Sequence, residues 1–281
     1  MKLSKLGMIL SSVVMLSMLG GLARADDPAA VPAPGASKRI DDIKARGTLR
    51  VGVLPDFPWL TQNITGSGEP FGGPAWMLAQ EYATRLGVKL EPVAVSHETK
   101  VPILASGQVD MTIAPLSETD QRKKVVDFVT YSNSSLCMFG KADNPKLKNV
   151  KNVSDLNRPD IVIAYFTGAA EEFWIPKEFP NAQHRSVTSS GTEAPVEEIM
   201  SGRADVAPDD KTSLVQLRKK IPGLATWPSG DACLTSTLFS QPVGLAIDKG
   251  QPVFLAWLTA VQQQIQPRLQ AEELRVMKAG Q

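Results

Sequence analysis

A strand-like run that leads directly into a helix start, at residues 109–128, most restricts what this chain can fold into. Residues 109–114 read Val-Asp-Met-Thr-Ile-Ala, and this apolar, partly β-branched run predicts a buried strand. Thr119 then stands where a helix N-cap is expected, with Asp120 in the first turn. The segment is therefore predicted to be a strand-to-helix turn of an α/β protein.

The same turn has the residue types of an anion-binding site. Backbone N–H groups at a helix start, the hydroxyls of Ser117 and Thr119 and the Arg122 guanidinium can converge on one point. The planar fork of an arginine matches the two oxygens of a carboxylate. From the residues alone, an ordinary capped helix with an exposed arginine in its first turn remains the alternative.

Strand and helix patterns alternate along most of the chain, which favours parallel α/β units. A second strand-to-helix turn, at residues 160–172, mirrors the first. Pro267 is predicted to end or kink the last helix. Strands are predicted at residues 48–54, 88–95, 108–114, 136–141, 160–166, 184–187, 204–210 and 242–247, and helices at 39–43, 76–86, 101–106, 193–200, 214–221 and 254–265.

The N-terminal residues have the pattern of an export signal. Lys2 and Lys5 precede an apolar run at residues 6–22, and Ala-Arg-Ala at 23–25 offers a cleavage site. We predict a signal peptide at residues 1–25; a membrane anchor is disfavoured because serines and glycines interrupt the short run. The Pro/Ala-rich residues 26–37 are predicted to be a disordered linker. The mature protein is thus expected to be soluble and exported, in the periplasm.

Charge and composition exclude several classes. The formal net charge of +1 becomes −2 without the three basic residues of the leader, which argues against a nucleic-acid partner. His97 and His184 are too few and too far apart for a metal site or catalytic triad, and no cofactor-binding motif is present. Cys137 and Cys233 form either one long-range disulfide or two buried thiols.

Several short motifs, in this order, resemble the family 3 bacterial solute-binding proteins, the periplasmic receptors for polar amino acids that serve ABC importers. The resemblance covers the chain from about Ile40 to the C-terminus. The motifs are Gly-Thr-Leu-Arg-Val-Gly-Val at 47–53, Leu-Gly-Val-Lys at 86–89, Ser-Gly-Gln-Val-Asp at 106–110, Ser-Glu-Thr-Asp-Gln-Arg-Lys-Lys-Val-Val-Asp-Phe at 117–128, Gly-Arg-Ala-Asp at 202–205 and Pro-Val-Gly-Leu-Ala-Ile-Asp-Lys-Gly at 242–250.

The resemblance implies the two-lobed α/β fold of type II periplasmic binding proteins, with the ligand in a cleft between the lobes. Lobe 1 is expected at residues 38–131 plus 241–281, and lobe 2 at residues 132–240. Both cysteines then fall in lobe 2, which favours a disulfide within that lobe. The implied function is capture of a small carboxylate-bearing solute, an amino acid or similar, by a monomer that delivers it to an ABC permease in the inner membrane.

The resemblance also implies ligand-binding residues. The family's carboxylate receptor corresponds to Ser117, Thr119 and Arg122, and its acidic partner for the ligand ammonium corresponds to Asp210. Two further positions match as well: Phe57 matches the aromatic residue that packs on the ligand, and Thr167 matches the start of the lobe 2 helix. Such a clamp suits a zwitterion because each buried charge is paired.

Several residues depart from the family pattern at the side-chain end of the expected site. Leu54 replaces an acid, and the run Gly-Gly-Pro-Ala-Trp at 72–76 lacks an aromatic and an acid that are usual there. Pro115 replaces a glycine, and Tyr165 stands where some receptors have a lysine. With Trp59 and Trp76, these residues make a more apolar or aromatic acid a plausible ligand.

Two other functions use the same cleft. Secreted cyclohexadienyl dehydratases, which act on prephenate and arogenate, resemble this family in fold, and Glu171 and Asp56 match the positions of their two functional acids. A carboxyl group across the cleft from bound substrate can act as a general acid if its pKa is raised. The alternative for Glu171 is an ordinary first-turn helix acid. A receptor that presents its ligand to a membrane sensor is the other function.

Overall fold

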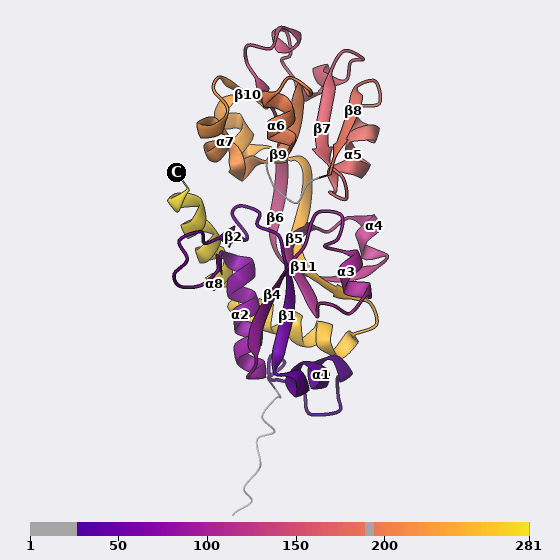
Figure 1. Ribbon diagram of the computed structural model, residues 1–281, viewed down its shortest axis with the longest axis vertical. Helices are drawn as coiled ribbons and strands as arrows, with labels where there is room; N and C mark the ends of the chain where they lie inside the picture. The colour runs from indigo at the N-terminus through magenta and orange to yellow at the C-terminus, as the bar shows by residue number, and fades with distance from the viewer. Residues whose placement is uncertain (1–26, 189–193, 281) are drawn as a thin grey trace, which may run out of the picture.

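The computed structural model describes residues 27–188 and 194–280 (Figure 1). The predicted signal peptide and the first residue of the predicted linker lie outside these ranges. None of the described helices is long and apolar enough to cross a membrane. Below, lobe 1 and lobe 2 mean the residue ranges predicted from the sequence. Those ranges remain a prediction.

Lobe 1, the lower body in Figure 1, follows the predicted alternation closely. Its parallel strands form because apolar runs alternate with helices that end at glycine: Gly47 and Gly87 cap α1 and α2 in the left-handed conformation. The elements are α1 (Lys38–Arg46), β1 (Thr48–Val53), β2 (Thr61–Gln62), β3 (Phe71–Gly72), α2 (Pro74–Leu86), β4 (Lys89–Ala94), α3 (Pro102–Ala105), β5 (Met111–Ser117), α4 (Asp120–Lys123) and α8 (Pro252–Ala279).

Lobe 2 repeats the plan with shorter elements. Its parallel pair β7 and β8 lies beside β9, with α5 and α6 connecting them along the chain. The elements are η1 (Pro145–Leu147), η2 (Val153–Leu156), β7 (Val162–Phe166), α5 (Glu171–Glu178), β8 (Gln183–Val187), α6 (Ala194–Met200), β9 (Val206–Asp210), η3 (Lys211–Ser213), α7 (Leu214–Lys220), β10 (Leu224–Trp227) and η4 (Gly230–Thr235).

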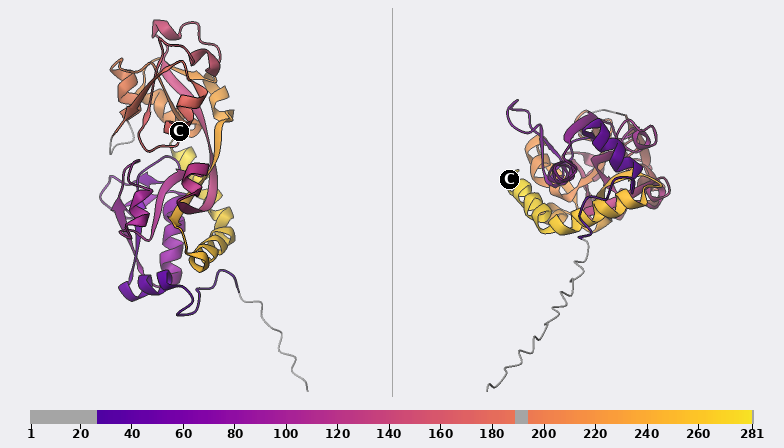
Figure 2. Two further views of the ribbon diagram at one scale, coloured as in Figure 1. Left: turned by 90° about the vertical axis from the view of Figure 1, so that its right-hand side faces the viewer. Right: turned by 90° about the horizontal axis from the view of Figure 1, so that it is seen from below.

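Two long strands join the lobes. The antiparallel strands β6 (Val126–Lys141) and β11 (Leu238–Asp248) run from the lower body into the upper one in Figures 1 and 2. They unite the described strands into a sheet of order β4-β1-β5-β11-β6-β9-β7-β8, and β10 pairs with β6. The strand ends of both lobes that carry the predicted site residues therefore face the interlobe space.

The buried apolar side chains fall into separate clusters on the two sides of the crossover. The largest contains residues up to Tyr131 and from Val243 onward, including Leu49, Tyr82 and Trp257. Two clusters of the other body lie between Cys137 and Leu238. Each body thus has a core of its own, so the cleft between them is free to hold polar groups.

The segment predicted to be a disordered linker differs from that expectation. Ala29 is 4% exposed and packs into the lobe 1 core. Its carbonyl accepts hydrogen bonds from the Trp257 indole (3.3 Å) and from Arg85 Nη1 (3.3 Å). Residues 27–37 are held by this docking, which Pro/Ala composition alone does not reveal because it depends on partners far along the chain.

The last helix, α8, continues beyond Pro267 to Ala279 and does not end there. Figure 1 shows it crossing behind the strands of lobe 1 and then rising so that its end lies beside α7. Lys219 of α7 donates a hydrogen bond to the carbonyl of Gly280 (3.2 Å), which ties the C-terminal turn to lobe 2. The helix therefore spans from one side of lobe 1 to the opposite lobe.

Cys137 and Cys233 form a disulfide within lobe 2. The bond joins β6 to η4 and lies in the cluster with Phe139 and Leu217. This pairing decides between the disulfide and the two free thiols that the sequence left open.

Candidate functional site

A cavity with about 900 Å³ of empty space, partly open to solvent, lies between the lobes. Its lining residues come from the loop after β1, from β5, from the turn after β7 and from the end of β9. The polar and aromatic residues among them are Asp56, Trp59, His97, Ser117, Ser134, Phe139, Tyr165, Phe166, Glu171, Asp209 and Asp210.

The first strand-to-helix turn is built as the sequence predicts. Thr119 caps α4, a single helical turn, by accepting a hydrogen bond from the Arg122 N–H (3.3 Å). Ser117 lines the cavity, whereas Thr119 and Arg122 are not among its lining residues. Ser117, at the end of β5, therefore borders the cavity, whereas the Arg122 guanidinium lies outside its lining.

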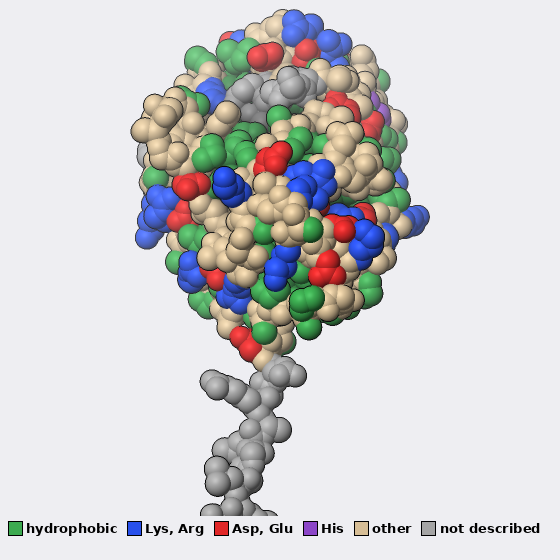
Figure 3. Space-filling model, turned by 60° about the horizontal axis from the view of Figure 1, so that its bottom comes forward, with side chains coloured by type: hydrophobic (Ala, Val, Ile, Leu, Met, Phe, Trp, Pro, Cys, Tyr) green, Lys and Arg blue, Asp and Glu red, His purple; other side chains and the backbone are tan. Residues whose placement is uncertain are grey.

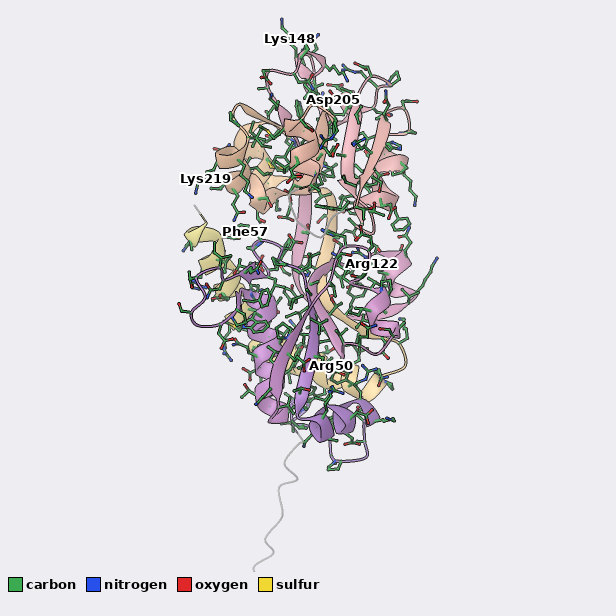
Figure 4. All side chains as sticks on the ribbon, viewed as in Figure 1. Arg50, Phe57, Arg122, Lys148, Asp205 and Lys219 are labelled. Carbon is green, nitrogen blue, oxygen red and sulfur yellow. A yellow bond between two sulfur atoms is a disulfide. The ribbon has the colours of Figure 1, made fainter. Side chains whose placement is uncertain are left out.

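The Arg122 side chain is only 9% exposed and bridges the lobes. Its Nη1 donates to the Ser117 carbonyl (3.0 Å) and its Nη2 to the Gly168 carbonyl of lobe 2 (3.1 Å). Figure 4 shows its label at the upper edge of lobe 1, where the two bodies meet. The fork is thus fixed by one carbonyl from each strand-to-helix turn.

The second turn approaches the first very closely at Gly168. Its φ is +77°, and a Cβ there would lie 2.7 Å from the His97 carbonyl oxygen, so only glycine fits. Glu172 holds this turn by accepting from the Gly168 N–H (2.8 Å), whereas Glu171 lines the cavity. The hydroxyl of Thr167 hydrogen-bonds to Ser186 of β8 (2.6 Å), so this predicted ligand residue faces its own sheet.

Two neighbouring carboxylates end β9. Asp210 is 6% exposed, and its oxygens accept from Ser134 and from the backbone and hydroxyl of Thr212. Asp209 accepts from the Asp210 N–H (2.7 Å) and from Ser213 (3.2 Å). Both line the cavity, and Asp210 is where the family resemblance expects an acid.

Lobe 1 contributes a buried pair of opposite charges. Asp56, in the loop after β1, lines the cavity, and its carboxylate interacts electrostatically with the Lys100 ammonium. Lys100 is 4% exposed and donates to the Pro115 carbonyl (3.2 Å). Sequence reasoning missed Lys100 because a lysine in a polar loop carries no signal of burial.

The cavity shifts the ionisation of its acids. Burial raises the pKa of Asp209 to about 7, with a further contribution from the neighbouring Asp210 charge. Burial also raises the pKa of Asp56; Lys100 opposes that rise, and the nearby lobe 2 acids add to it. Burial, assisted by Arg122, lowers the pKa of Lys100. The raised pKa values of Asp56 and Asp209 follow from carboxyl groups sharing one poorly solvated space, whereas the lowered pKa of Lys100 follows from burial beside Arg122 and is opposed by Asp56 and Glu171.

His97 closes one side of the cavity. Its ring stacks on Phe166 of lobe 2 at 4.2 Å between centroids, with 17° between the planes. Burial, together with Lys100 and Arg122, lowers the pKa of His97 to about 2, so the ring is neutral at ordinary pH. The sequence offered His97 only as an isolated histidine, and its role in joining the lobes depends on the tertiary fold.

Of the aromatic and apolar residues that the sequence suggested for the site, some line the cavity and others do not. Trp59 and Tyr165 line the cavity, but Leu54 does not. Trp76 hydrogen-bonds to Glu69 (3.1 Å) and packs in the lobe 1 core. Phe57 lies against the C-terminal turn, where a Cβ on Gly280 would be 2.9 Å from its ring, and it lines a neighbouring crevice instead.

The charged side chains of one outer face form no patch of a single sign. On the face shown in Figure 3, basic and acidic side chains are interspersed. Among the described residues, no group of three His, Cys, Asp or Glu side chains is placed to hold a metal ion. The interlobe cavity is therefore the candidate site.

Comparison with known proteins places this geometry in a family. The model of the bacterial extracellular solute-binding proteins, family 3, matches residues 49–275. The L-cystine-binding protein TcyJ of Escherichia coli is 25% identical over 253 residues, which cover 89% of this chain and 87% of TcyJ.

Relatives of this fold also include enzymes. Membrane-bound lytic murein transglycosylase F of Vibrio vulnificus is 26% identical over 214 residues, which are 68% of this chain and 39% of that protein. The crystal structure of the ancestral amino acid-binding protein AncCDT-1, a precursor of cyclohexadienyl dehydratase, matches with a TM-score of 0.68 and 28% identity, covering 85% of this chain and 98% of that one. The predicted two-lobed α/β fold is confirmed.

Proposed function

The chain belongs to the bacterial extracellular solute-binding proteins, family 3, and on that premise we propose that it captures a small amino-acid-like solute bearing both a carboxylate and cationic groups. The observation that carries the proposal is the charge pattern of the cavity. Among the described residues, four carboxylates line it and no lysine or arginine does. A solute with ammonium or guanidinium groups would pair these acids and offset their burial.

The carboxylate of the solute is proposed to bind at the first strand-to-helix turn. The guanidinium of Arg122 has five N–H donors, and two of them meet the Ser117 and Gly168 carbonyls. Within the described residues its side chain makes no other hydrogen bond, so donors remain beside Ser117. A carboxylate there would gain charge-assisted hydrogen bonds from the fixed fork.

The acids favour basic amino acids over the apolar or aromatic acids that the sequence suggested. Asp56 of lobe 1 faces Glu171, Asp209 and Asp210 of lobe 2. A single α-ammonium pairs with only part of this group of carboxyls, whereas an additional side-chain cation can pair with more of them and favours their ionised form. The ancestral protein AncCDT-1 is itself described as a cationic amino acid solute-binding protein.

Calorimetry with the purified protein tests this assignment. We expect L-arginine, L-lysine or L-ornithine to bind, L-glutamine to bind more weakly and L-glutamate not at all. Tighter binding of L-phenylalanine or of L-glutamate than of every basic amino acid would contradict the charge argument.

The proposed location and partner of the protein are taken from the role of its family. We propose an exported periplasmic monomer that delivers its solute to an ABC permease. Co-purification of the ligand-loaded protein with an ABC permease from membranes of its source bacterium tests this role. Specific capture of a membrane sensor instead would favour the receptor alternative.

A second candidate, a cyclohexadienyl dehydratase, is favoured by one observation. Asp56 and Glu171 line the same cavity from opposite lobes, and burial raises the pKa of Asp56, as a general acid requires. The likeness to a dehydratase precursor supports it further. Incubation with prephenate and arogenate should yield an aromatic product if this candidate is right. No product above a heat-inactivated control would remove it.

A further inference from the structure

We propose that Glu273, on the C-terminal part of α8, is a positioning residue that fixes the Trp59 wall of the cavity through Ser132. The proposal rests on the proposed function, because Trp59 matters only if the interlobe cavity holds the solute. It assigns a role in the site to a helix segment that lies outside the cavity lining.

A short hydrogen-bonded chain joins the three residues. The Trp59 indole Nε1–H donates to Ser132 Oγ (3.0 Å), and the Ser132 hydroxyl donates to Glu273 Oε1 (3.0 Å). A hydroxyl has one proton, so donating it to the carboxylate leaves the lone pairs of Ser132 to accept from the indole. The direction of the chain is therefore fixed, with the carboxylate as its final acceptor.

Trp59 needs such an anchor because of where it lies. It belongs to the loop between β1 and β2, yet its side chain is 3% exposed and lines the cavity. Ser132 lies on β6, at the start of the crossover to lobe 2. The relay thus pins a loop aromatic to the strand that joins the lobes, and an indole with an unpaired buried N–H would be costly.

The carboxylate is not explained by helix stability. Burial raises the pKa of Glu273, and the hydrogen bond from Ser132 opposes that rise, as does the nearby Trp59 indole. An apolar residue would pack at this position without the desolvation penalty of a carboxylate. Its neighbour Glu272 instead pairs with the exposed Arg275 of the same helix (2.7 Å).

The geometry depends on α8 continuing past Pro267. The earlier part of the helix packs in the lobe 1 core through Phe254, Trp257 and Leu258. The later part brings Glu273 to Ser132 and ends against Lys219 of lobe 2. In Figure 4 the labels of Phe57 and Lys219 lie on this side of the molecule, across from Arg122. The C-terminal part of α8 therefore fixes the Trp59 side of the cleft, whereas the first strand-to-helix turn fixes the Arg122 side.

The indole N–H signals in NMR test the relay without any ligand. Trp59→Phe assigns the Trp59 signal by removing it. We expect Ser132→Ala and Glu273→Leu each to shift that signal and to speed its hydrogen exchange at least ~10-fold, and Glu273→Gln, which keeps an acceptor oxygen, to restore most of the protection. Arg275→Gln, two positions further along α8 at an exposed side chain, is the matched control and should change nothing.

Binding of L-arginine then separates positioning from general stability. Glu273→Leu should weaken binding about three- to tenfold, the range expected for one lost hydrogen bond. It should have no further effect in the Trp59→Phe background, because the relay is already broken there. An unchanged Trp59 signal in Glu273→Leu, or fully additive losses, would overturn the proposal. Absence of L-arginine binding to the parent protein would count against the proposed function, while the NMR result still decides the relay.

Discussion

The two strand-to-helix turns that meet across the cleft look alike in sequence but are built differently. The lobe 1 turn has a side-chain cap, Thr119, and a buried cation, Arg122. The lobe 2 turn has no side-chain cap on α5 and instead begins that helix with two acids, Glu171 and Glu172. The Gly168 carbonyl of the lobe 2 turn accepts a hydrogen bond from Arg122 of the lobe 1 turn. A donor of one turn is thus paired with an acceptor of the other.

On the proposed function, the difference between the turns suits both charges of a zwitterion. A guanidinium held by carbonyls marks the lobe 1 turn, and three carboxyl groups from two elements mark the lobe 2 side, with Asp56 of lobe 1 across from them. A solute that pairs with the Arg122 guanidinium of one lobe and the acids of the other would stabilise the closed arrangement. Changes to the two turns should therefore have unequal, separable effects.

Replacing Arg122 should have the largest effect. Arg122→Ala removes the cation at the lobe 1 turn and its bridge to Gly168, so affinity for the bound amino acid should fall by roughly 2 to 5 kcal/mol. Calorimetry measures the loss. Lys123→Ala, which removes a half-exposed cation that pairs with Asp120, is the control and should bind normally. Parent-like affinity in Arg122→Ala would refute the carboxylate assignment.

Neutralising Glu171 should have the next largest effect, and only on cations. Glu171→Gln keeps the shape of the side chain but removes one cavity charge, so binding of L-arginine should weaken by about 1 to 3 kcal/mol. Binding of L-glutamine should change little. Glu178→Gln, at the exposed end of the same helix, is the control. Equal losses for both ligands would mean that Glu171 acts on the fold of the turn and not on ligand charge.

As pH rises from about 4 to about 7, the free energy of unfolding should fall while the affinity for a cationic solute should rise. The folded pKa of Asp209, about 7, exceeds its ordinary value of 3.8, so between these values the native state keeps a proton that the unfolded chain has lost. The contribution of Asp209 to stability is therefore full below about pH 4 and declines up to about pH 7.

A cationic solute favours the ionised carboxylate, so its binding should release protons and tighten as pH rises through the same window. The change should approach tenfold per pH unit for each proton released. Calorimetry in buffers of different ionisation enthalpy counts the protons. Asp209→Asn should flatten both profiles, and profiles that persist unchanged would assign the proton to another group.

Changing Glu172 should have the smallest effect. Glu172→Gln keeps an acceptor for the Gly168 N–H but loses the charge, so unfolding free energy should fall by about 0.5 to 1 kcal/mol. Affinity for L-arginine should stay within about twofold. Chemical denaturation and calorimetry measure the two quantities. A loss of affinity as large as that of Glu171→Gln would show that the two acids of this turn do not divide their roles.

Much of the fold could be predicted because its signals are local. Gly87 at the end of a helical stripe, Thr119 before a polar first turn and the apolar run of β7 lead to the observed elements. Where the structure differs from the sequence prediction, the cause is a contact between residues far apart in the chain. Ala29, in the predicted linker, packs into the lobe 1 core and accepts a hydrogen bond from the Trp257 indole, 228 positions away.

The sequence by itself determined the alternation of strands and helices, the family, and the residue types of the first turn, since these depend on neighbours a few positions apart. It also located Asp56, Glu171 and Asp210, which line the cavity. Only the tertiary structure decided that Arg122 donates to Gly168, that Lys100 and His97 belong to the site and that Glu273 reaches Ser132. Those contacts join residues 15 to 141 positions apart, and their energies depend on burial that no local pattern records.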